Sequence, residues 1–450
     1  MSETLYAEHV NPAFVRLLGV FGYGRVFVRA QGVQMWDREG RVYLDALAGF
    51  GSVNVGHNHP RLLARLKALL DESPLHFAHT GPSPQAAELA ARLAGWSGLD
   101  VSLFASSGAE AVDAALKLAR AATGREAILY CDGAFHGLTL GALSVLGSSR
   151  LRRPFEPLVP HCSAVPFGDL GALERALAKT HAAAFIVEPV QAEGGVRVPP
   201  PGYLAEVGRL CRRAGTVFIL DEIQTGLGRT GTRFAFEGEG EGAVPDALLL
   251  AKSLGGGIAP ISAVVTRRAL HAKAYGRTDR FDLHGSTFAG NALSCVAALE
   301  TLAIVEDEGL CGNAAARGDE LCRGLQERLR GHPLVREVRG RGLLVGIELG
   351  PTEAGWLNRA APFLVRGVAR SLLGHWVSLR LLERGIVAQP ASQEWNVLRL
   401  EPPLTVTSAD VRTIVEAVGG VLDDYRQIPA VVAAVGSRLR EQRRRRWAFR

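Results

Sequence analysis

The sequence lacks the features that would place a protein in a membrane or outside the cell. No stretch approaches the ~20 uninterrupted apolar residues that a bilayer-spanning helix needs. The first nine residues, MSETLYAEH, contain no basic segment followed by an apolar core, so no secretory signal peptide is predicted. The six cysteines form no CxxC pair and no Cys/His cluster with zinc-site spacing. We therefore expect a soluble, cytoplasmic protein with reduced cysteines, no metal site and no membrane partner.

A basic surface is also lacking, although the formal net charge is +6. Seven arginines and one glutamate lie within residues 438–450, and the rest of the chain holds equal numbers of basic and acidic side chains. The body therefore has no nucleic-acid-binding signature, and we expect no nucleic-acid partner. A solvated helix end is the favoured interpretation of the arginine-rich tail, and contact with an anionic partner, especially through residues 443–446, is the alternative.

Short apolar runs alternate with helical stretches in the middle of the chain. Continuous apolar strands separated by helices favour a mostly parallel sheet that is covered on both faces. A β-hairpin is expected earlier, over residues 33–45, around the turn at 37–40. The apolar strands are predicted at residues 101–105, 127–131, 183–187, 216–220, 247–251 and 261–265, with a helix over 109–121.

Both ends of the chain lie outside this pattern. A helix over about residues 292–308 is interpreted as a bridge out of the sheet domain. A helix over 408–424 is expected to begin at Ser408 as its N-cap, without a capping box. Further strands are predicted at 343–349 and 396–400. The fold class is thus α/β, with three expected parts: an N-terminal segment of the small domain (1–59), a large domain (60–305), and a C-terminal small domain with the arginine-rich tail (306–450).

Distinctive residues follow several of the predicted strands, where an α/β sheet gathers its functional groups. Ser107 and Gly108 open a helix whose free N–H groups suit a phosphate. Phe135 suits a stacking platform, and Asp221 ends an apolar strand, where a carboxylate needs a cationic partner. Lys252 lies in apolar surroundings, and a desolvated lysine becomes a nucleophile that forms a Schiff base.

Each of these features alone has an ordinary structural explanation. Many strand-to-helix turns resemble the one at Ser107, and a lone phenylalanine such as Phe135 usually lies in the core. Asp221 could cap a helix, and Lys252 could lie on the surface after an edge strand. Together, and in one order, they meet the needs of pyridoxal 5′-phosphate: an anion site, a ring-stacking partner, a carboxylate for the pyridine nitrogen and a lysine for the aldehyde. We therefore expect this cofactor.

A set of motifs resembles the class III (ω-type) aminotransferases of fold type I, over roughly residues 30–425. The resemblance implies a large, mostly parallel sheet domain, a small α+β domain built from both chain ends, and an active homodimer. The motifs are VGHNHP at 55–60, SGAEA at 107–111, AFHG at 134–137, VEPVQAEGG at 187–195, LDEIQTG at 220–226, AK at 251–252, GSTFAGN at 285–291, VRGRGL at 338–343 and LRLEPP at 398–403.

The resemblance also implies a role for each matching residue. Lys252 and Asp221 are the expected catalytic residues: the lysine would bind the aldehyde and move protons, and the aspartate would keep the pyridine nitrogen protonated. The other expected cofactor-binding residues are Ser107, Gly108 and Ala109 at the phosphate, Phe135 and His136 beside the ring, Gln224 near the ring hydroxyl, and Thr287 at the phosphate of the neighbouring subunit.

Arg399 and Glu193 match a substrate-binding pair of this family. Such an enzyme accepts an amine and then a keto acid in one pocket. An unpaired buried arginine is costly, so Glu193 would neutralise Arg399 while an amine is bound, and the keto-acid carboxylate would then replace it. An ordinary salt bridge between domains is the structural alternative.

Within the family, residues 134–144 and 397–405 most resemble the putrescine (diamine) aminotransferase branch, and Leu138 stands where many relatives carry Arg or Lys. We expect amino-group transfer between a primary amine (a diamine or ω-amino compound), or its aldehyde, and a keto acid such as 2-oxoglutarate or pyruvate. An amino-acid racemase, epimerase or aminomutase on the same fold is the alternative, since it would share Lys252, Asp221 and Gln224. A non-catalytic binding protein is disfavoured by the intact lysine.

Overall fold

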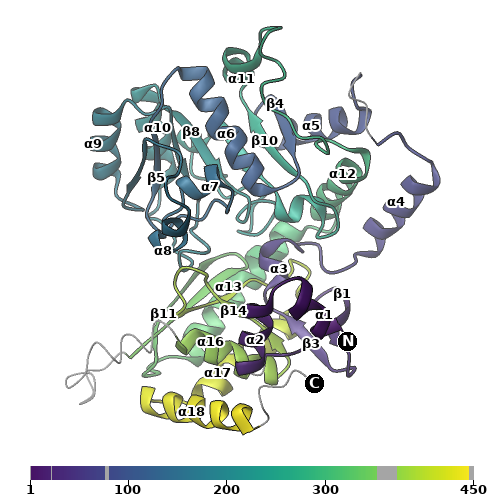
Figure 1. Ribbon diagram of the computed structural model, residues 1–450, viewed down its shortest axis with the longest axis vertical. Coiled ribbons are helices and arrows are strands. Elements are labelled where there is room, and N and C mark those ends of the chain that lie inside the picture. The colour runs from purple at the N-terminus through teal and green to yellow at the C-terminus, as the bar shows by residue number, and fades with distance from the viewer. Residues whose placement is uncertain (1, 22, 77–80, 352–371, 445–450) are drawn as a thin grey trace.

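A seven-stranded sheet runs through the upper body of the molecule in Figure 1. The computed structural model describes residues 2–21, 23–76, 81–351 and 372–444. In spatial order the strands are β4 (Val101–Ala105), β10 (Ser262–Thr266), β9 (Ala247–Leu250), β8 (Val217–Asp221), β7 (Ala184–Val187), β5 (Ile128–Cys131) and β6 (Cys162–Val165). The pairs from β9 to β6 are parallel, and β10 is antiparallel to both β9 and β4.

The sheet is mostly parallel, as the apolar runs predicted, and six of its strands match them to within one or two residues. Strand β6 was not predicted. Its four residues include only one that is fully buried, so this edge strand lacks the continuous apolar run of the inner strands.

Helices cover both faces of this sheet, which explains why its inner strands are apolar throughout. On one face α6 (Gly108–Thr123) packs in a buried cluster that includes Ile219 of β8. On the other face α10 (Tyr203–Ala214) belongs to the cluster that includes Phe218, the preceding residue of the same strand. Alternate side chains of one strand thus lie in two separate apolar layers.

Two four-stranded sheets form the lower body in Figure 1. Strand β13 pairs in parallel with β3, opposite Leu44, and so joins the two ends of the chain. The fold is therefore the expected large sheet domain with a small α+β part built from both ends, while the proposed boundaries near residues 60 and 305 stay predictions. The sheets are β1 (Phe27–Gln31), β2 (Gln34–Asp37), β3 (Val42–Asp45) and β13 (Ile386–Val387), and β11 (Val335–Arg341), β12 (Leu344–Leu349), β15 (Val397–Leu400) and β14 (Gln389–Pro390).

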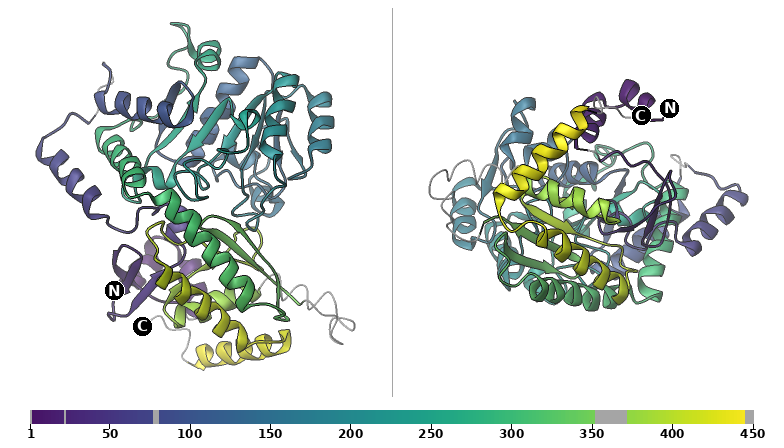
Figure 2. Two further views of the ribbon diagram at one scale, coloured as in Figure 1. Left: turned by 180° about the vertical axis from the view of Figure 1, so that it is seen from behind. Right: turned by 90° about the horizontal axis from the view of Figure 1, so that it is seen from below.

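The hairpin predicted over residues 33–45 is confirmed by the antiparallel pairing of β2 with β3. The strand that precedes it, β1, was not predicted. The expected helix over 292–308 is α12 (Ala292–Asp307), which packs against α4 (Pro60–Asp71) and α5 (Pro84–Ser97). It is followed by α13 (Leu310–Arg328), which crosses the lower body beside α17 (Ser408–Asp423), as Figure 2 shows from behind.

The start of α17 corrects the expected cap. Thr407, not Ser408, is the N-cap: its hydroxyl accepts from the N–H of Asp410 at 3.2 Å, and Asp410 accepts from the N–H of Thr407 at 2.9 Å. This is a capping box, with aspartate in the place usually taken by glutamate. The expectation of a helix without one was wrong because it began one residue too late.

The other helices of the described residues are α1 (Ser2–His9), α2 (Pro12–Phe21), α3 (Ala48–Gly51), α7 (Leu140–Ser144), α8 (Ser149–Arg152), α9 (Leu170–Thr180), α11 (Arg268–Tyr275), α16 (Gly374–Glu383) and α18 (Ile428–Arg444), with 3₁₀ segments at Arg153–Phe155, Glu241–Ala243 and Lys252–Gly255. The arginine-rich tail is helical as far as Arg444, and residues 445–450 lie outside the described residues. None of the described helices has both the length and the apolar character needed to cross a bilayer.

Candidate active site

Lys252 lies at the end of β9, where the strand gives way to a single 3₁₀ turn. Its backbone has a φ of 46°, a left-handed conformation that a non-glycine residue rarely adopts. Its ammonium group donates to the side-chain oxygen of Gln224. Burial lowers the pKa of Lys252, against the opposing charges of Glu401 and Glu193. The lowered pKa increases the neutral, nucleophilic fraction of this amine.

Asp221 is the last residue of β8, and its side chain is buried. One carboxylate oxygen lies 2.6 Å from Nδ1 of His136, and the other accepts from the N–H of Ile223 at 3.0 Å. The side-chain partner of this buried carboxylate is therefore the imidazole of His136, supplied by the loop after β5. The structure brings Asp221 and His136 together, and their expected role in cofactor binding stays a prediction.

Glu188 follows β7 directly and was not singled out from the sequence. Its side chain is buried and accepts from the N–H of Phe135 at 2.9 Å. Burial, aided by the charge of Asp221, raises the pKa of Glu188 well above its ordinary value. This buried carboxyl thus holds the loop that carries Phe135, whose side chain is half-buried. The position of Glu188 at a strand end was the signal that could have identified it.

The start of α6 offers free backbone donors. Ser107 caps the helix in a capping box with Glu110, which itself accepts from the N–H of Ser107 at 2.8 Å. The N–H groups of Gly108 and Ala109 have no acceptor among the described residues. A Cβ on Gly108 would lie 3.1 Å from the side chain of Ile223, so glycine lets this helix end approach the strand end that carries Asp221.

Arg399 of β15 and Glu193 form a buried ion pair in which NH1 of the guanidinium donates to the carboxylate. The second oxygen of Glu193 accepts from the N–H of Ser392 at 2.9 Å. Burial alone would raise the pKa of Glu193, but the charges of Arg399 and Lys252 outweigh it and lower the pKa to about 2. The sequence predicted this pair, and the structure places it beside Lys252.

Two further buried charges adjoin the pair and were missed. Glu401 lies two residues after Arg399, and its carboxylate accepts from Nε2 of Gln224 at 2.9 and 3.1 Å. Arg229, fully buried, lies 3.8 Å from the same carboxylate. The strand alternation that puts Arg399 and Glu401 on one face was the available signal.

Phe50 also adjoins this cluster, since the guanidinium carbon of Arg399 lies 5.2 Å from the centre of its ring. Phe50 has a φ of 61° within α3, whose other residues are also left-handed. Nothing in its sequence context indicated this conformation.

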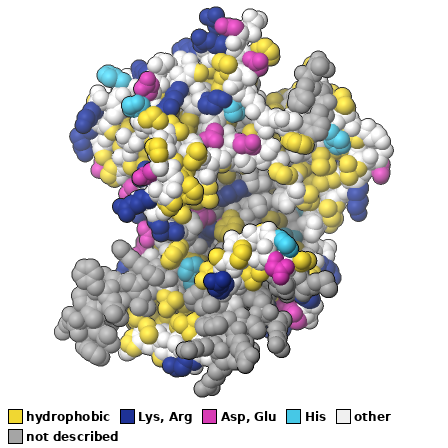
Figure 3. All heavy atoms as spheres, viewed as in Figure 1, with side chains coloured by type: hydrophobic (Ala, Val, Ile, Leu, Met, Phe, Trp, Pro, Cys, Tyr) yellow, Lys and Arg dark blue, Asp and Glu magenta, His cyan; other side chains and the backbone are white. Residues whose placement is uncertain are grey.

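Two singled-out residues lie at the surface. Thr287 is exposed in a turn after α11 and, among the described residues, has no hydrogen bond to a member of the Lys252 cluster. Leu138, just before α7, is 62 % exposed. Elsewhere on the face seen in Figure 3, basic and acidic side chains are interspersed over the upper body.

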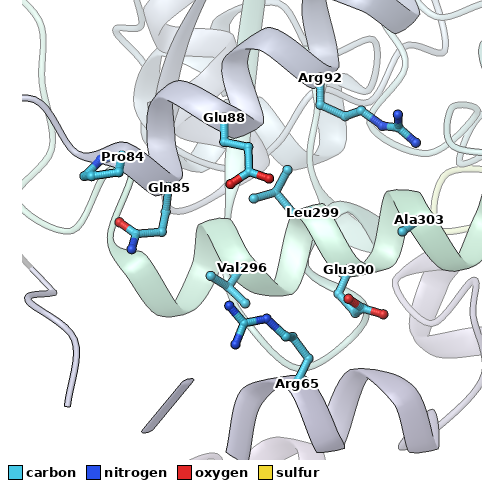
Figure 4. Close-up of a pocket in the computed structure, with 9 residues that line it drawn as sticks. All are labelled: Arg65, Pro84, Gln85, Glu88, Arg92, Val296, Leu299, Glu300 and Ala303. Carbon is cyan, nitrogen blue, oxygen red and sulfur yellow. The ribbon is translucent and has the colours of Figure 1, made fainter. Parts of the chain in front are cut away.

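A pocket of about 520 Å³ between α4, α5 and α12 is separate from this cluster (Figure 4). Arg65 and Arg92 share its lining with Glu88 and Glu300, so charges of both signs offset one another there. It contains none of the residues predicted for the site.

The raised pKa of Glu188 generates a pH-dependent prediction. As the pH rises above 4.5, the ordinary value, the unfolded chain releases this proton before the folded protein does, so wild type should lose stability relative to Glu188→Gln between pH 5 and 8. Glu188→Ala leaves the N–H of Phe135 without its acceptor and should cost about 1–3 kcal/mol at both pH values. Urea unfolding measures both effects. A glutamine variant as unstable as the alanine variant would mean that Glu188 is charged.

Known proteins share this architecture. The family described as "Aminotransferase class-III" matches residues 22–422. Aminotransferase PigE of Serratia sp. (strain ATCC 39006) is 37% identical over 456 residues, which cover 93% of this chain and 53% of PigE, so the chain spans about half the length of that relative.

Solved structures of aminotransferases have a similar fold. The ornithine aminotransferase of Toxoplasma gondii ME49 superposes with a TM-score of 0.79 at 34% identity, covering 88% of this chain and 90% of that one. A PLP-bound amine transaminase from an uncultivated Pseudomonas species gives a TM-score of 0.78 at 30% identity, covering 89% and 95%. With these likenesses and the strand-end cluster together, the chain belongs to the class III aminotransferase family, with the fold of type I.

Proposed function

We propose that this enzyme uses pyridoxal 5′-phosphate to move an amino group between a primary amine, either a diamine or an ω-amino compound, or its aldehyde, and a keto acid such as 2-oxoglutarate or pyruvate. The observation that carries the proposal is the buried Arg399–Glu193 pair in the same cluster as Lys252. This pair suits a pocket that receives a carboxylate in one half of the reaction and none in the other.

The residues fit the cofactor. Buried polar atoms without a hydrogen-bond partner among the described residues include Nε2 of His136 and NH2 of Arg399, which is expected where a polar ligand belongs. Gly108 and Ala109 offer backbone N–H groups at a helix start, which suits a phosphate. When bound, pyridoxal phosphate supplies an electron sink for the bonds at the amine carbon. Ser107 and Phe135 would complete the phosphate and ring contacts.

Each polar group then has a task that its surroundings support. Lys252, with its lowered pKa, would bind the aldehyde and afterwards carry protons to and from the amine carbon on Nζ. Asp221, oriented by His136 and Ile223, would keep a proton on the ring nitrogen. Gln224, which accepts from Lys252, would face the ring hydroxyl.

Dual recognition supports transamination over isomerisation. A racemase, epimerase or aminomutase would keep Lys252 and Asp221 but handle a single substrate, so it would gain nothing from a carboxylate that masks an arginine. Removing Glu193 from Arg399 would leave a buried cation unpaired unless a substrate carboxylate took its place. The pair is useful where two substrates alternate.

The class of amine substrate is proposed from the residues that surround the site. Leu138 is exposed where many class III enzymes carry a cation, so an α-amino carboxylate donor would find no second positive charge there. The similar enzymes have names that include ornithine, acetylornithine and amine transaminases, a range that spans α-amino acids and simple amines. The diamine assignment rests on Leu138 and on residues 134–144 and 397–405.

The active unit is proposed to be a homodimer. Thr287 lies on a surface turn, and among the described residues it has no hydrogen bond to the Lys252 cluster. Phe281 and Leu283 before it are 71% and 55% exposed, and such apolar side chains are stabilised when a second subunit covers them. Thr287 would then reach the partner's phosphate.

Borohydride reduction of enzyme loaded with pyridoxal phosphate tests the assignment of Lys252. The reduced label should be found by peptide mass spectrometry on Lys252. Lys252→Ala should fold and carry no such label, whereas Lys273→Ala, a change on α11, should keep it. Label on another lysine would remove Lys252 from its role.

The two half-reactions should respond oppositely to changes in the ion pair. Arg399→Ala removes the carboxylate anchor and should slow the 2-oxoglutarate half by about 2–5 kcal/mol, while Glu193→Gln should slow mainly the amine half. Single-turnover mixing, with enzyme loaded with pyridoxamine phosphate for the keto-acid half, separates them. Equal slowing of both halves by Arg399→Ala contradicts the exchange. Ornithine as by far the best donor would contradict the diamine assignment.

Mixed dimers test whether Thr287 acts across the interface. Lys252→Ala and Thr287→Ala should each impair the enzyme, and at limiting cofactor the loss of a hydrogen bond to a charged phosphate should weaken binding about 10- to 100-fold. Mixing the two variants should restore activity, because one site of the mixed dimer then has both residues intact. Sedimentation should show a dimer at assay concentration. No restoration on mixing would place Thr287 in its own subunit's site.

A further inference from the structure

Glu401 is a carboxylate with no contact with solvent, at the point where β15 ends. Its backbone N–H donates to the carbonyl of Ala46 at 2.7 Å, which ties it to the N-terminal part of the small domain. A Cβ on Gly51 would lie 2.4 Å from its oxygen Oε1, so the chain keeps room for this carboxylate with a glycine in the left-handed region. This position accommodates a buried carboxylate and leaves it without access to a substrate from solvent.

Glu401 fixes the orientation of the Gln224 amide. Both of its oxygens accept from Nε2 of Gln224, at 3.1 and 2.9 Å. The opposite orientation would point the amide oxygen at a carboxylate and leave two acceptors facing each other. The amide oxygen of Gln224 must therefore face away from Glu401, and there it accepts from Nζ of Lys252.

Glu401 is also the permanent counter-ion of two buried guanidinium groups. Its oxygens lie 3.8 Å from Nε of Arg229 and 3.7 Å from Nε of Arg399. Arg229 is held in addition by the carbonyl of Leu343, 3.0 Å from its NH1. Glu193 pairs with a different nitrogen of Arg399, NH1, and is the member of the cluster that a substrate carboxylate would displace.

We propose that Glu401 is a positioning residue that holds Arg399 from its Nε side while Glu193 and the substrate exchange on the other side, and that it orients Lys252 through Gln224. The inference rests on the proposed function, since it assigns the fixed part of the same site. Arg399 then stays in position whichever anion binds its NH1. The amide of Gln224 lies between the carboxylate of Glu401 and the amino group of Lys252 and connects the two by hydrogen bonds.

The charge of Glu401 has a measurable consequence at Lys252. Three carboxylates, those of Glu401, Glu193 and Asp221, favour the ammonium form of Lys252, and the charge of Arg399 opposes it. Glu401 makes the largest contribution of the three. Removing it should make Lys252 lose its proton at lower pH. A residue that merely filled space would leave the titration of Lys252 unchanged.

The test compares Glu401→Gln with wild type in the full-length protein freed of pyridoxal phosphate. Trinitrobenzenesulfonate labels neutral amines, and peptide mass spectrometry follows Lys252 alone across a pH series. The pH midpoint of labelling should fall by about one unit. In the loaded enzyme the KM for the keto acid should rise about tenfold, because Arg399 loses its fixed partner. Glu320→Gln is the matched control, since Glu320 pairs with Arg317 and Arg412 away from the site.

An unchanged midpoint in a folded Glu401→Gln variant overturns the proposal, as does an equal shift in Glu320→Gln. If Glu401→Gln does not fold, Glu401→Asp carries the test. Its shorter side chain keeps a charge near the guanidinium groups but withdraws it from Gln224, so the midpoint should still fall, and a wild-type midpoint overturns the proposal. If wild type did not link pyridoxal phosphate at Lys252, the proposed function would be wrong. The labelling comparison uses protein without the cofactor, so its result on Glu401 would be independent of that failure.

Discussion

The cost of burying charge governs the arrangement of this site. An ion loses several kcal/mol of hydration, on the order of the stability of a whole domain, when it leaves water, so each buried charge needs a partner. Arg399 has two, Glu193 and Glu401, and Asp221 has His136. Because Asp221 and His136 come from the large sheet and Arg399 and Glu401 come from β15, Gln224 and the Glu193 loop hold the two bodies in a fixed relation.

The parallel sheet supplies the other half of this arrangement. Strands β7, β8 and β9 run in the same direction, so the residues at or just after their ends, Glu188, Asp221 and Lys252, lie at one edge of the sheet. Strands that ran alternately up and down would deliver them to opposite edges. The antiparallel β10 lies beyond β9 and leaves this order intact. Burial and the charge of Asp221 raise the pKa of Glu188, so these strand ends disfavour a further negative charge there.

Sequence patterns were sufficient where the relevant property is local. Lys252 and Asp221 each end a continuous apolar strand, and a charge in that place is conspicuous. Arg229 was missed because it lies in a glycine-rich loop that resembles an exposed turn, and its complete burial depends on carbonyls of residues 343 and 402. Glu401 was quoted within a motif without a role, since its importance comes from neighbours more than a hundred residues away. The roles assigned to the site residues stay predictions.

In the proposed reaction, Arg399 binds Glu193 and a substrate carboxylate in turn. Such an arginine needs another anion that stays in a fixed position. If Glu193 were the sole counter-ion of Arg399, the guanidinium would be left unpaired whenever Glu193 moved away. It would then move with Glu193 or toward solvent, and the binding site for the substrate carboxylate would be disrupted. In the proposal, Glu401 would remove that difficulty, because its own position is set by Gln224, by Arg229 and by the backbone of Ala46, and none of these three would take part in the exchange. In the proposed exchange, the occupant of one nitrogen of Arg399 would change and the rest of the charge cluster would stay in place.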